Sequence, residues 1–370
     1  MPRIKKIFLR TLITLGILYL LICIMMYFFQ EALIFHPKKL DPGFKFSFEQ
    51  PFDERHLINV ENTPTLHGLH FKTDSSKGLV FYLHGNAGAL DTWGKAAKTY
   101  TDLGYDFFIM DYRSYGKSEG EITDETSFYD DLRQWYSHLK KEYPEDSIII
   151  IGYSIGTGPA AMLASENNPR MLILQTPYYS LTDMMQHTYP FVPTFLLKYK
   201  FSTNEFIQKT KAPVVIFHGD ADEIIYYGSS EKLKQHFKKG DTLITLKGLG
   251  HNGMNKDEEY KSVLGAMLSK YEPLAAKWYD QLILDWIEHT DHNLFLQNTK
   301  ADKTDISWLF QGEVGTDTAY YFIFRVGHTV TDSGVLSPRY ISDAWLYLDT
   351  LKRKVFEYDV ATEKISEWKK

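Results

Sequence analysis

Short, nearly continuous apolar runs recur through the middle of the chain, at residues 79–83, 107–110, 148–151, 171–174 and 214–217. A strand buried on both faces has this composition, because helices cover both sides of a parallel sheet. Helical stretches separate the runs, and the clearest carries an apolar stripe made of Phe128, Leu132, Trp135 and Leu139. Strands that alternate with helices in this way predict an α/β fold with a mostly parallel sheet flanked by helices.

Composition narrows the class of protein further. Hydrophobic residues make up 44% of the 370 residues and aromatic residues 15%, enough for a large core, and the length predicts two domains. The formal net charge is -6 and no run rich in lysine and arginine follows the first ten residues, which argues against nucleic-acid binding. The single cysteine, Cys23, excludes an intrachain disulfide and a metal site built on cysteines.

The N-terminal region contains an uncharged apolar segment from Thr11 to Phe29. About 19 residues form a helix of ~28 Å, close to the ~30 Å thickness of bilayer hydrocarbon. A secretory signal peptide is the main alternative, but its shorter apolar region would precede small residues, whereas bulky residues occupy 25–30 here. We therefore expect an uncleaved transmembrane anchor over residues 1–31.

Basic residues flank this segment unevenly. Those before it are Arg3, Lys5, Lys6 and Arg10, and those after it are Lys38 and Lys39. Positive charge favours the cytoplasmic side of a bilayer. The pattern predicts a single-pass protein with a cytoplasmic N-terminus and an exported globular part, periplasmic or otherwise extracytoplasmic.

A strand, a tight turn and a helix are predicted in direct succession around Gly152-Tyr153-Ser154-Ile155-Gly156. A β-branched run precedes this string and a run of small residues follows it, while the two glycines permit the sharp bend that lifts a serine hydroxyl clear. The same spacing occurs around Ser118, but a polar loop follows there. We therefore assign Ser118 to a loop and Ser154 to a nucleophile elbow.

A serine hydroxyl is a weak nucleophile until a base removes its proton, and a carboxylate must orient that base. On an α/β sheet of this type the order along the chain is serine, acid, histidine. The run 214–217 leads into a loop where Asp222 is the preferred acid, with Asp220 and Glu223 as alternatives. His251 follows a predicted strand over 243–246, in a glycine-flanked loop, and is the candidate base.

Attack on a carbonyl produces an oxyanion, which two backbone N–H groups must meet. One candidate donor is Ile155, the residue after the nucleophile. The other lies in the glycine-rich turn 83–88, where Asn86 is preferred and Ala87 is second, ahead of a helix expected over 92–103. A simple tight turn would need the same glycines. This chemistry requires no metal ion and no organic cofactor.

The remaining segments complete the predicted domain plan. Two further strands are expected around 56–60 and 66–71, and an irregular, aromatic-rich cap insertion over 180–211. The α/β pattern stops near Tyr271. Beyond it, a helix over 274–287 and strands over 320–326, 344–348 and 354–360 predict a small α+β module. The domains are thus 1–31 (anchor), 32–272 (α/β domain) and 273–370 (C-terminal α+β domain of unknown role).

These motifs together resemble the α/β-hydrolase superfamily, and within it a membrane-anchored, small-lid branch that includes protein depalmitoylases and serine-aminopeptidase-like proteins. The resemblance covers roughly residues 33–271 and rests on motifs that begin at His84, Asp111, Gly152, His218 and Gly250. By it, Ser154, Asp222 and His251 match the nucleophile, acid and base, and Ser118 matches a non-catalytic loop serine. Ser114 stands where family members often have glycine.

The expectation is a membrane-tethered serine hydrolase that cleaves an ester or thioester of a small-molecule or lipid-linked acyl substrate. Two alternatives stay open. One is an aminopeptidase-like amide hydrolase. The other is a non-catalytic scaffold on a hydrolase fold, with a C-terminal domain that binds an envelope partner.

Overall fold

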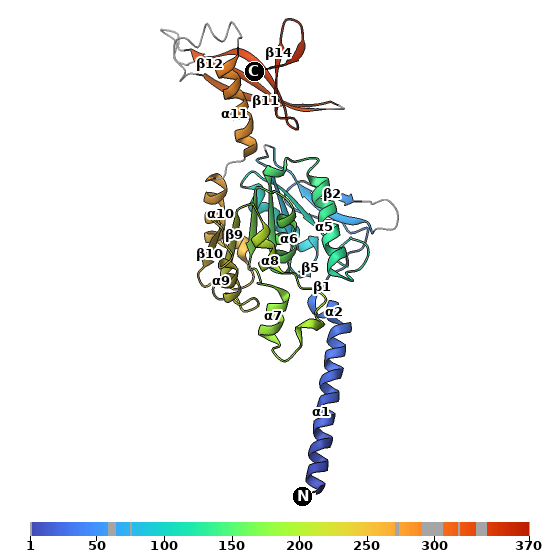
Figure 1. The fold of residues 1–370 in the computed structure, drawn as a ribbon. Coiled ribbons are helices and arrows are strands. Elements are labelled where there is room, and N and C mark those ends of the chain that lie inside the picture. The colour runs from blue at the N-terminus through green and yellow to red at the C-terminus, as the bar shows by residue number, and fades with distance from the viewer. Residues whose placement is uncertain are drawn as a thin grey trace. The chain divides into compact units, whose positions relative to one another are not determined.

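The computed structural model describes residues 2–57, 64–74, 76–270, 274–290, 306–316, 319–330 and 339–369. The chain divides into two compact units, Met1–Tyr271 and Glu272–Lys370 (Figure 1). Each unit has its own buried core.

The first unit is built on an eight-stranded sheet in the order β10-β9-β8-β7-β4-β6-β3-β2. Neighbours from β10 to β6 pair in parallel, and β2 and β3 add an antiparallel edge. The strands are β2 (Phe52–Leu57), β3 (Leu66–Phe71), β4 (Leu79–Leu83), β6 (Asp106–Met110), β7 (Ile148–Tyr153), β8 (Met171–Gln175), β9 (Val214–Gly219) and β10 (Thr242–Leu246). The predicted α/β fold is confirmed.

Helices cover both faces of this sheet (Figure 1). Alternate residues of β7 point to opposite sides: Ile148 and Ile150 belong to one core, and Ile149 and Ile151 belong to the other. The helices are α5 (Glu125–Leu139), α6 (Thr157–Glu166), α8 (Thr203–Lys209), α9 (Gly228–Lys234) and α10 (Glu258–Lys270). The predicted apolar stripe of α5 is buried. Burial on two faces explains why the strands are continuous apolar runs.

The prediction of a single helix over 92–103 was wrong. The chain forms α3 (Leu90–Trp93), the 3-10 turn η1 (Gly94–Ala96) and α4 (Ala97–Thr101) instead. A Cβ at Gly94 would lie 2.4 Å from the Phe48 ring, so a larger residue there would force the ring to move. Glycine in turn weakens a helix at that point.

The cap insertion was also predicted wrongly as irregular throughout. It contains α7 (Leu181–Thr188), the 3-10 turn η4 (Thr194–Leu196) and α8. Ser180 caps α7, because its side chain accepts a hydrogen bond from the Asp183 N–H at 3.0 Å. Only the chain between these elements lacks regular structure.

The N-terminal part begins with α1 (Pro2–Phe28), followed by α2 (Gln30–Ile34). The stretch Lys5–Phe28 has a mean hydropathy of 2.4 and is long and apolar enough to cross a membrane. The next residues form β1 (His36–Pro37), which pairs in parallel with β5 (Ala87–Gly88). This two-residue ladder joins the segment that follows α2 to the loop after β4.

The second unit contains α11 (Leu274–His289) and a five-stranded antiparallel sheet in the order β11-β12-β13-β14-β15. Ile283 and Trp286 of α11 pack in a core with the sheet residues Phe324, Val326 and Leu346. The strands are β11 (Ile306–Gly315), β12 (Tyr320–Val330), β13 (Arg339–Asp349), β14 (Lys354–Asp359) and β15 (Lys364–Glu367). The sequence had not predicted β11 and β15.

Candidate active site

Ser154 lies directly after β7, at the first residue of the 3-10 turn η3 (Ser154–Gly156), which leads into α6. Its φ of 52° is in the left-handed region, which a residue with a side chain seldom adopts. Neither flanking glycine leaves room for a side chain. A Cβ at Gly152 would lie 2.5 Å from the Gly156 oxygen, and one at Gly156 would lie 2.3 Å from the Leu83 oxygen. Strand, strained serine and helix together form the predicted elbow.

The structure brings together the three residues that the sequence singled out. His251 Nε2 lies 3.0 Å from Ser154 Oγ, and His251 Nδ1 lies 2.8 Å from Asp222 Oδ2. All three side chains are at least nine-tenths buried. With the Nδ1 proton donated to Asp222, Nε2 is free to accept the hydroxyl proton of Ser154. This is the geometry of a serine activated by an oriented imidazole.

The carboxylate of Asp222 receives hydrogen bonds on both oxygens. Oδ1 accepts the backbone N–H groups of Ile224 and Ile225, each at 2.8 Å, and Oδ2 lies 3.2 Å from His218 Nε2 in addition to His251. Burial raises the pKa of Asp222, but the hydrogen bonds from His218 and His251 outweigh burial and hold its pKa well below the usual range. Asp222 is therefore a carboxylate at neutral pH.

Sequence reasoning missed the second imidazole on this carboxylate. His218 is fully buried, with Nδ1 2.6 Å from Ser230 Oγ and Nε2 2.9 Å from the Ile225 oxygen. Because its Nε2 faces two acceptors, that nitrogen carries the proton. The signal was available, since His218 lies near the end of the same buried strand that leads to Asp222.

The two alternative acids have other partners. Asp220 pairs with Lys247 at 2.9 Å and accepts the Gly248 N–H at 2.6 Å. Glu223 accepts the backbone N–H of His251 at 3.3 Å and so steadies the loop rather than the ring. Asp222 is the acid whose carboxylate contacts the imidazole.

The candidate oxyanion donors lie on two neighbouring segments. Ile155 follows Ser154 in η3, so its N–H belongs to the N-terminal turn ahead of α6. Asn86 lies between β4 and β5, and its side chain bonds to the end of α2 and to β1: Nδ2 donates to the Ile34 oxygen at 2.5 Å, and Oδ1 accepts the His36 N–H at 3.1 Å. Tyr115 Oη donates to the Asn86 carbonyl at 2.6 Å. Ala87 lies next to Asn86, in β5.

Ser118 has a structural position, as its loop assignment predicted. Its hydroxyl donates to the Asp111 carbonyl at 2.6 Å and accepts the His67 N–H at 2.9 Å, and the side chain is buried. The Ser118 hydroxyl therefore bridges the Asp111 carbonyl and the His67 N–H.

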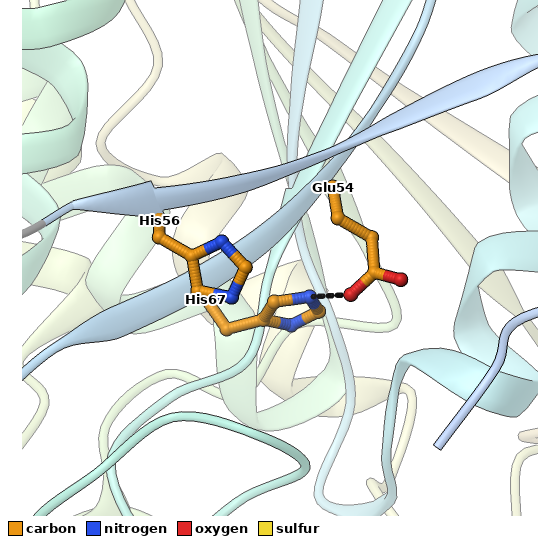
Figure 2. A group of neighbouring side chains, drawn as sticks. All are labelled: Glu54, His56 and His67. Carbon is orange, nitrogen blue, oxygen red and sulfur yellow. Dashed lines mark hydrogen bonds and ion pairs between the residues drawn. The ribbon is translucent and has the colours of Figure 1, made fainter. Parts of the chain in front are cut away.

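A separate cluster on the antiparallel edge of the sheet contains three side chains of the kinds that bind metal ions. Ligand atoms of Glu54, His56 and His67 lie within 4.8 Å of one another, on the adjacent strands β2 and β3 (Figure 2). Glu54 Oε2 is 3.2 Å from His67 Nε2 and also accepts the ammonium of Lys117 at 2.8 Å. A divalent cation would have to displace this ammonium and would be repelled by it. The arrangement fits an ion-paired polar network better than a metal centre.

Comparison with known proteins gives matches to the first unit. Residues 74–204 match the family described as serine aminopeptidase. Alpha/beta hydrolase domain-containing protein 17B from Homo sapiens is 30% identical over 203 residues, 53% of this chain and 68% of that protein. Lysophosphatidylserine lipase ABHD12 from Macaca fascicularis is 26% identical over 230 residues, 54% of this chain and 58% of the lipase. An esterase structure from Pyrococcus furiosus matches with a TM-score of 0.50 and 20% identity, over 65% of this chain and 98% of the esterase.

These matches carry different weight. The esterase structure shows the fold alone. The chain spans little more than half of the lipase, so the lipase's activity does not transfer by similarity. The identity to the human protein extends over two thirds of that protein's length. The chain belongs to the α/β-hydrolase superfamily.

Proposed function

We propose that this protein is a membrane-tethered serine hydrolase that cleaves an ester or thioester bond of an acyl substrate through an acyl-enzyme. The observation that carries the proposal is the continuous chain of contacts from Asp222 through His251 to Ser154, at 2.8 and 3.0 Å. A strained serine next to an oriented imidazole is costly to maintain for structure alone.

In the first half-reaction His251 Nε2 takes the proton of Ser154 as Oγ attacks the carbonyl carbon. The N–H groups of Ile155 and Asn86 hold the resulting oxyanion, and loss of one such donor typically costs ~10²–10³ in rate. His251 then protonates the leaving alcohol or thiol. Asp222 remains ionised and stabilises the imidazolium.

In the second half-reaction water replaces the leaving group. His251 removes a proton from water, the hydroxide attacks the acyl carbon, and Ser154 regains its proton as the acid departs. The same imidazole acts as base and then as acid in each half.

The membrane tether is proposed from the apolar stretch Lys5–Phe28 and from contacts just beyond it. Gln30 Nε2 donates to the Leu196 oxygen at 3.2 Å, and Gln30 Oε1 accepts the Lys198 N–H at 2.8 Å. These contacts to the cap favour a helix that stays attached over a signal peptide that is removed. The basic residues at 3–10 favour a cytoplasmic N-terminus and an exported catalytic unit.

The relatives support an acyl substrate, since one is named a lysophosphatidylserine lipase. The family match of residues 74–204 favours a second candidate, amide hydrolysis at an amino terminus. That reaction also requires a carboxylate placed to bind the substrate amine. For the second unit we propose binding to an envelope partner.

Fluorophosphonate labelling of the full-length protein tests the proposal, with Ser154→Ala as the negative control. Ser118→Ala is the matched control, because Ser118 has the same glycine spacing; a melting curve verifies its fold. We expect labelling of the native protein and of Ser118→Ala, and none of Ser154→Ala. Equal labelling of the native protein and Ser154→Ala would favour the non-catalytic scaffold. Rates on acyl esters, acyl thioesters and aminoacyl amides separate the two enzyme candidates.

A further inference from the structure

The cap contains an exposed aromatic segment, residues 189–197, which we call the cap segment. Phe191 is 85% exposed, Phe195 is 83% exposed and Tyr189 is 56% exposed. The sequence from Thr188 to Leu197 has no charged residue. Large aromatic side chains this exposed, without charges between them, are unusual on a surface that faces water.

The backbone of the cap segment is suited to an apolar environment. Pro190 and Pro193 have no N–H group to satisfy. The N–H groups of Val192, Leu196 and Leu197 bond within the segment, at 3.0, 3.2 and 3.1 Å. Hydrocarbon penalises unpaired backbone groups heavily, so both features lower the cost of placing a loop there.

Two carbonyls of the cap segment accept hydrogen bonds from side chains of the N-terminal helices, one from α1 and one from α2. Tyr19 Oη donates to the Phe191 oxygen at 2.8 Å, and the Leu196 oxygen accepts Gln30 Nε2 at 3.2 Å. Tyr19 lies inside the apolar stretch that is long enough to cross a membrane, which ends at Phe28. Nine residues correspond to ~13 Å along a helix axis, within the ~15 Å half-thickness of a bilayer's hydrocarbon. A cap segment bonded to Tyr19 is therefore below the headgroups when the helix spans the bilayer.

Charged groups mark where this apolar region stops. Lys198 follows the segment directly, and its ammonium lies 3.1 Å from Glu31 Oε1 and 5.0 Å from the centroid of the Tyr27 ring. Tyrosine and lysine are typical of the membrane–water boundary. Lys198 therefore marks a membrane–water boundary at the level of Phe28, where the apolar stretch ends.

The cap insertion is attached next to the candidate nucleophile. Tyr178 lies between β8 and the insertion, and its Oη donates to the Ile155 oxygen at 2.9 Å and accepts the Gly158 N–H at 3.1 Å. The insertion thus connects the turn that carries Ser154 to the cap segment.

We propose that the cap segment enters the acyl-chain region of the leaflet that adjoins the catalytic unit. Its aromatic rings contact lipid chains there, and the enzyme draws an acyl substrate from that leaflet. The inference rests on the proposed membrane-tethered hydrolase and names its substrate class as esters or thioesters whose acyl chain resides in a bilayer.

Depth-dependent fluorescence quenching tests the placement. A Cys23→Ala background carries Phe191→Cys or, as a control, Ser137→Cys at an exposed position of α5, each labelled with an environment-sensitive dye. The full chain is reconstituted in phosphatidylcholine vesicles. We expect quenching at 191 by lipids with a nitroxide on the acyl chain, and quenching at 137 by aqueous iodide only. Iodide quenching at both positions would overturn the proposal, as would protection of 191 without lipid quenching, which would assign the segment to a protein contact.

A paired activity assay tests the substrate class. Phe191→Ser with Phe195→Ser is compared with the native protein on a soluble short-chain ester and on a long-chain ester held in vesicles. We expect equal rates on the soluble ester and a loss of about tenfold on the vesicle ester. If the double variant matched the native rate on both esters, the leaflet proposal would be overturned, whereas the proposed hydrolase function would stand. A native protein that hydrolyses neither ester would instead contradict the proposed function.

Discussion

At the scale of single residues, the charge on Asp222 is the feature on which the proposed chemistry depends. Asp222→Asn keeps the size of the side chain but presents an amide that cannot stabilise the imidazolium, so we expect kcat to fall by about 10³–10⁴. Asp220→Asn is the matched control, since Asp220 pairs with Lys247 instead, and we expect it to retain most activity. Steady-state kinetics on a soluble ester measure both. Similar losses in the two variants would contradict the assignment.

Among the elements, the pairing of β1 with β5 joins the segment after the N-terminal helices to the candidate oxyanion loop. Asn86→Ala keeps the backbone N–H but removes the side-chain bonds to Ile34 and His36. We expect kcat to fall by ~10–10² while KM changes little, because the donor is displaced rather than deleted. Tyr115→Phe, which leaves both anchor bonds in place, is expected to lose less. Full kcat in Asn86→Ala would show that these side-chain bonds do not position the loop.

At the scale of the whole molecule, buried histidines make the fold sensitive to acid. Burial, with Arg55 and Lys72 nearby, lowers the pKa of His70 to about 3, and burial lowers that of His84 to about 4. Unfolded histidine titrates near pH ~6.5, so below that pH the unfolded chain binds more protons. Stability is therefore full above pH ~6.5 and falls by up to about 1.4 kcal/mol per pH unit for each ring, as pH drops toward those values.

Denaturant unfolding in detergent at pH 7 and pH 5 measures this effect. His70→Gln retains groups that can bond Tyr143 and Arg55, whose side chains contact His70. We expect a smaller loss between the two pH values in this variant than in the native protein. An unchanged loss would assign the acid sensitivity to other groups.

Burial and element length explain which parts of the structure the sequence could predict. Strands β4 and β7 were predictable, because burial on both faces leaves a continuous apolar run. The order of Ser154, Asp222 and His251 along the chain predicted which side chains the fold brings together. The sequence preferred Asp222 but left Asp220 and Glu223 open, because only the folded chain shows which carboxylate contacts the imidazole. The β1–β5 ladder is two residues long and leaves no periodic signal. The edge strand β15 is exposed throughout, so no apolar run marks it.

Gly156 has a consequence for substrate selection. Its missing side chain lets the start of α6 approach within van der Waals range of the Leu83 and His84 carbonyls, so the segments that carry Ile155 and Asn86 lie in direct contact. If the N–H groups of Ile155 and Asn86 are the oxyanion donors, this contact is expected to hold them in place before a ligand binds, without induced fit. We then expect selectivity among acyl substrates to depend on how each substrate reaches the site. The catalytic unit alone is expected to hydrolyse many small, soluble esters at similar rates.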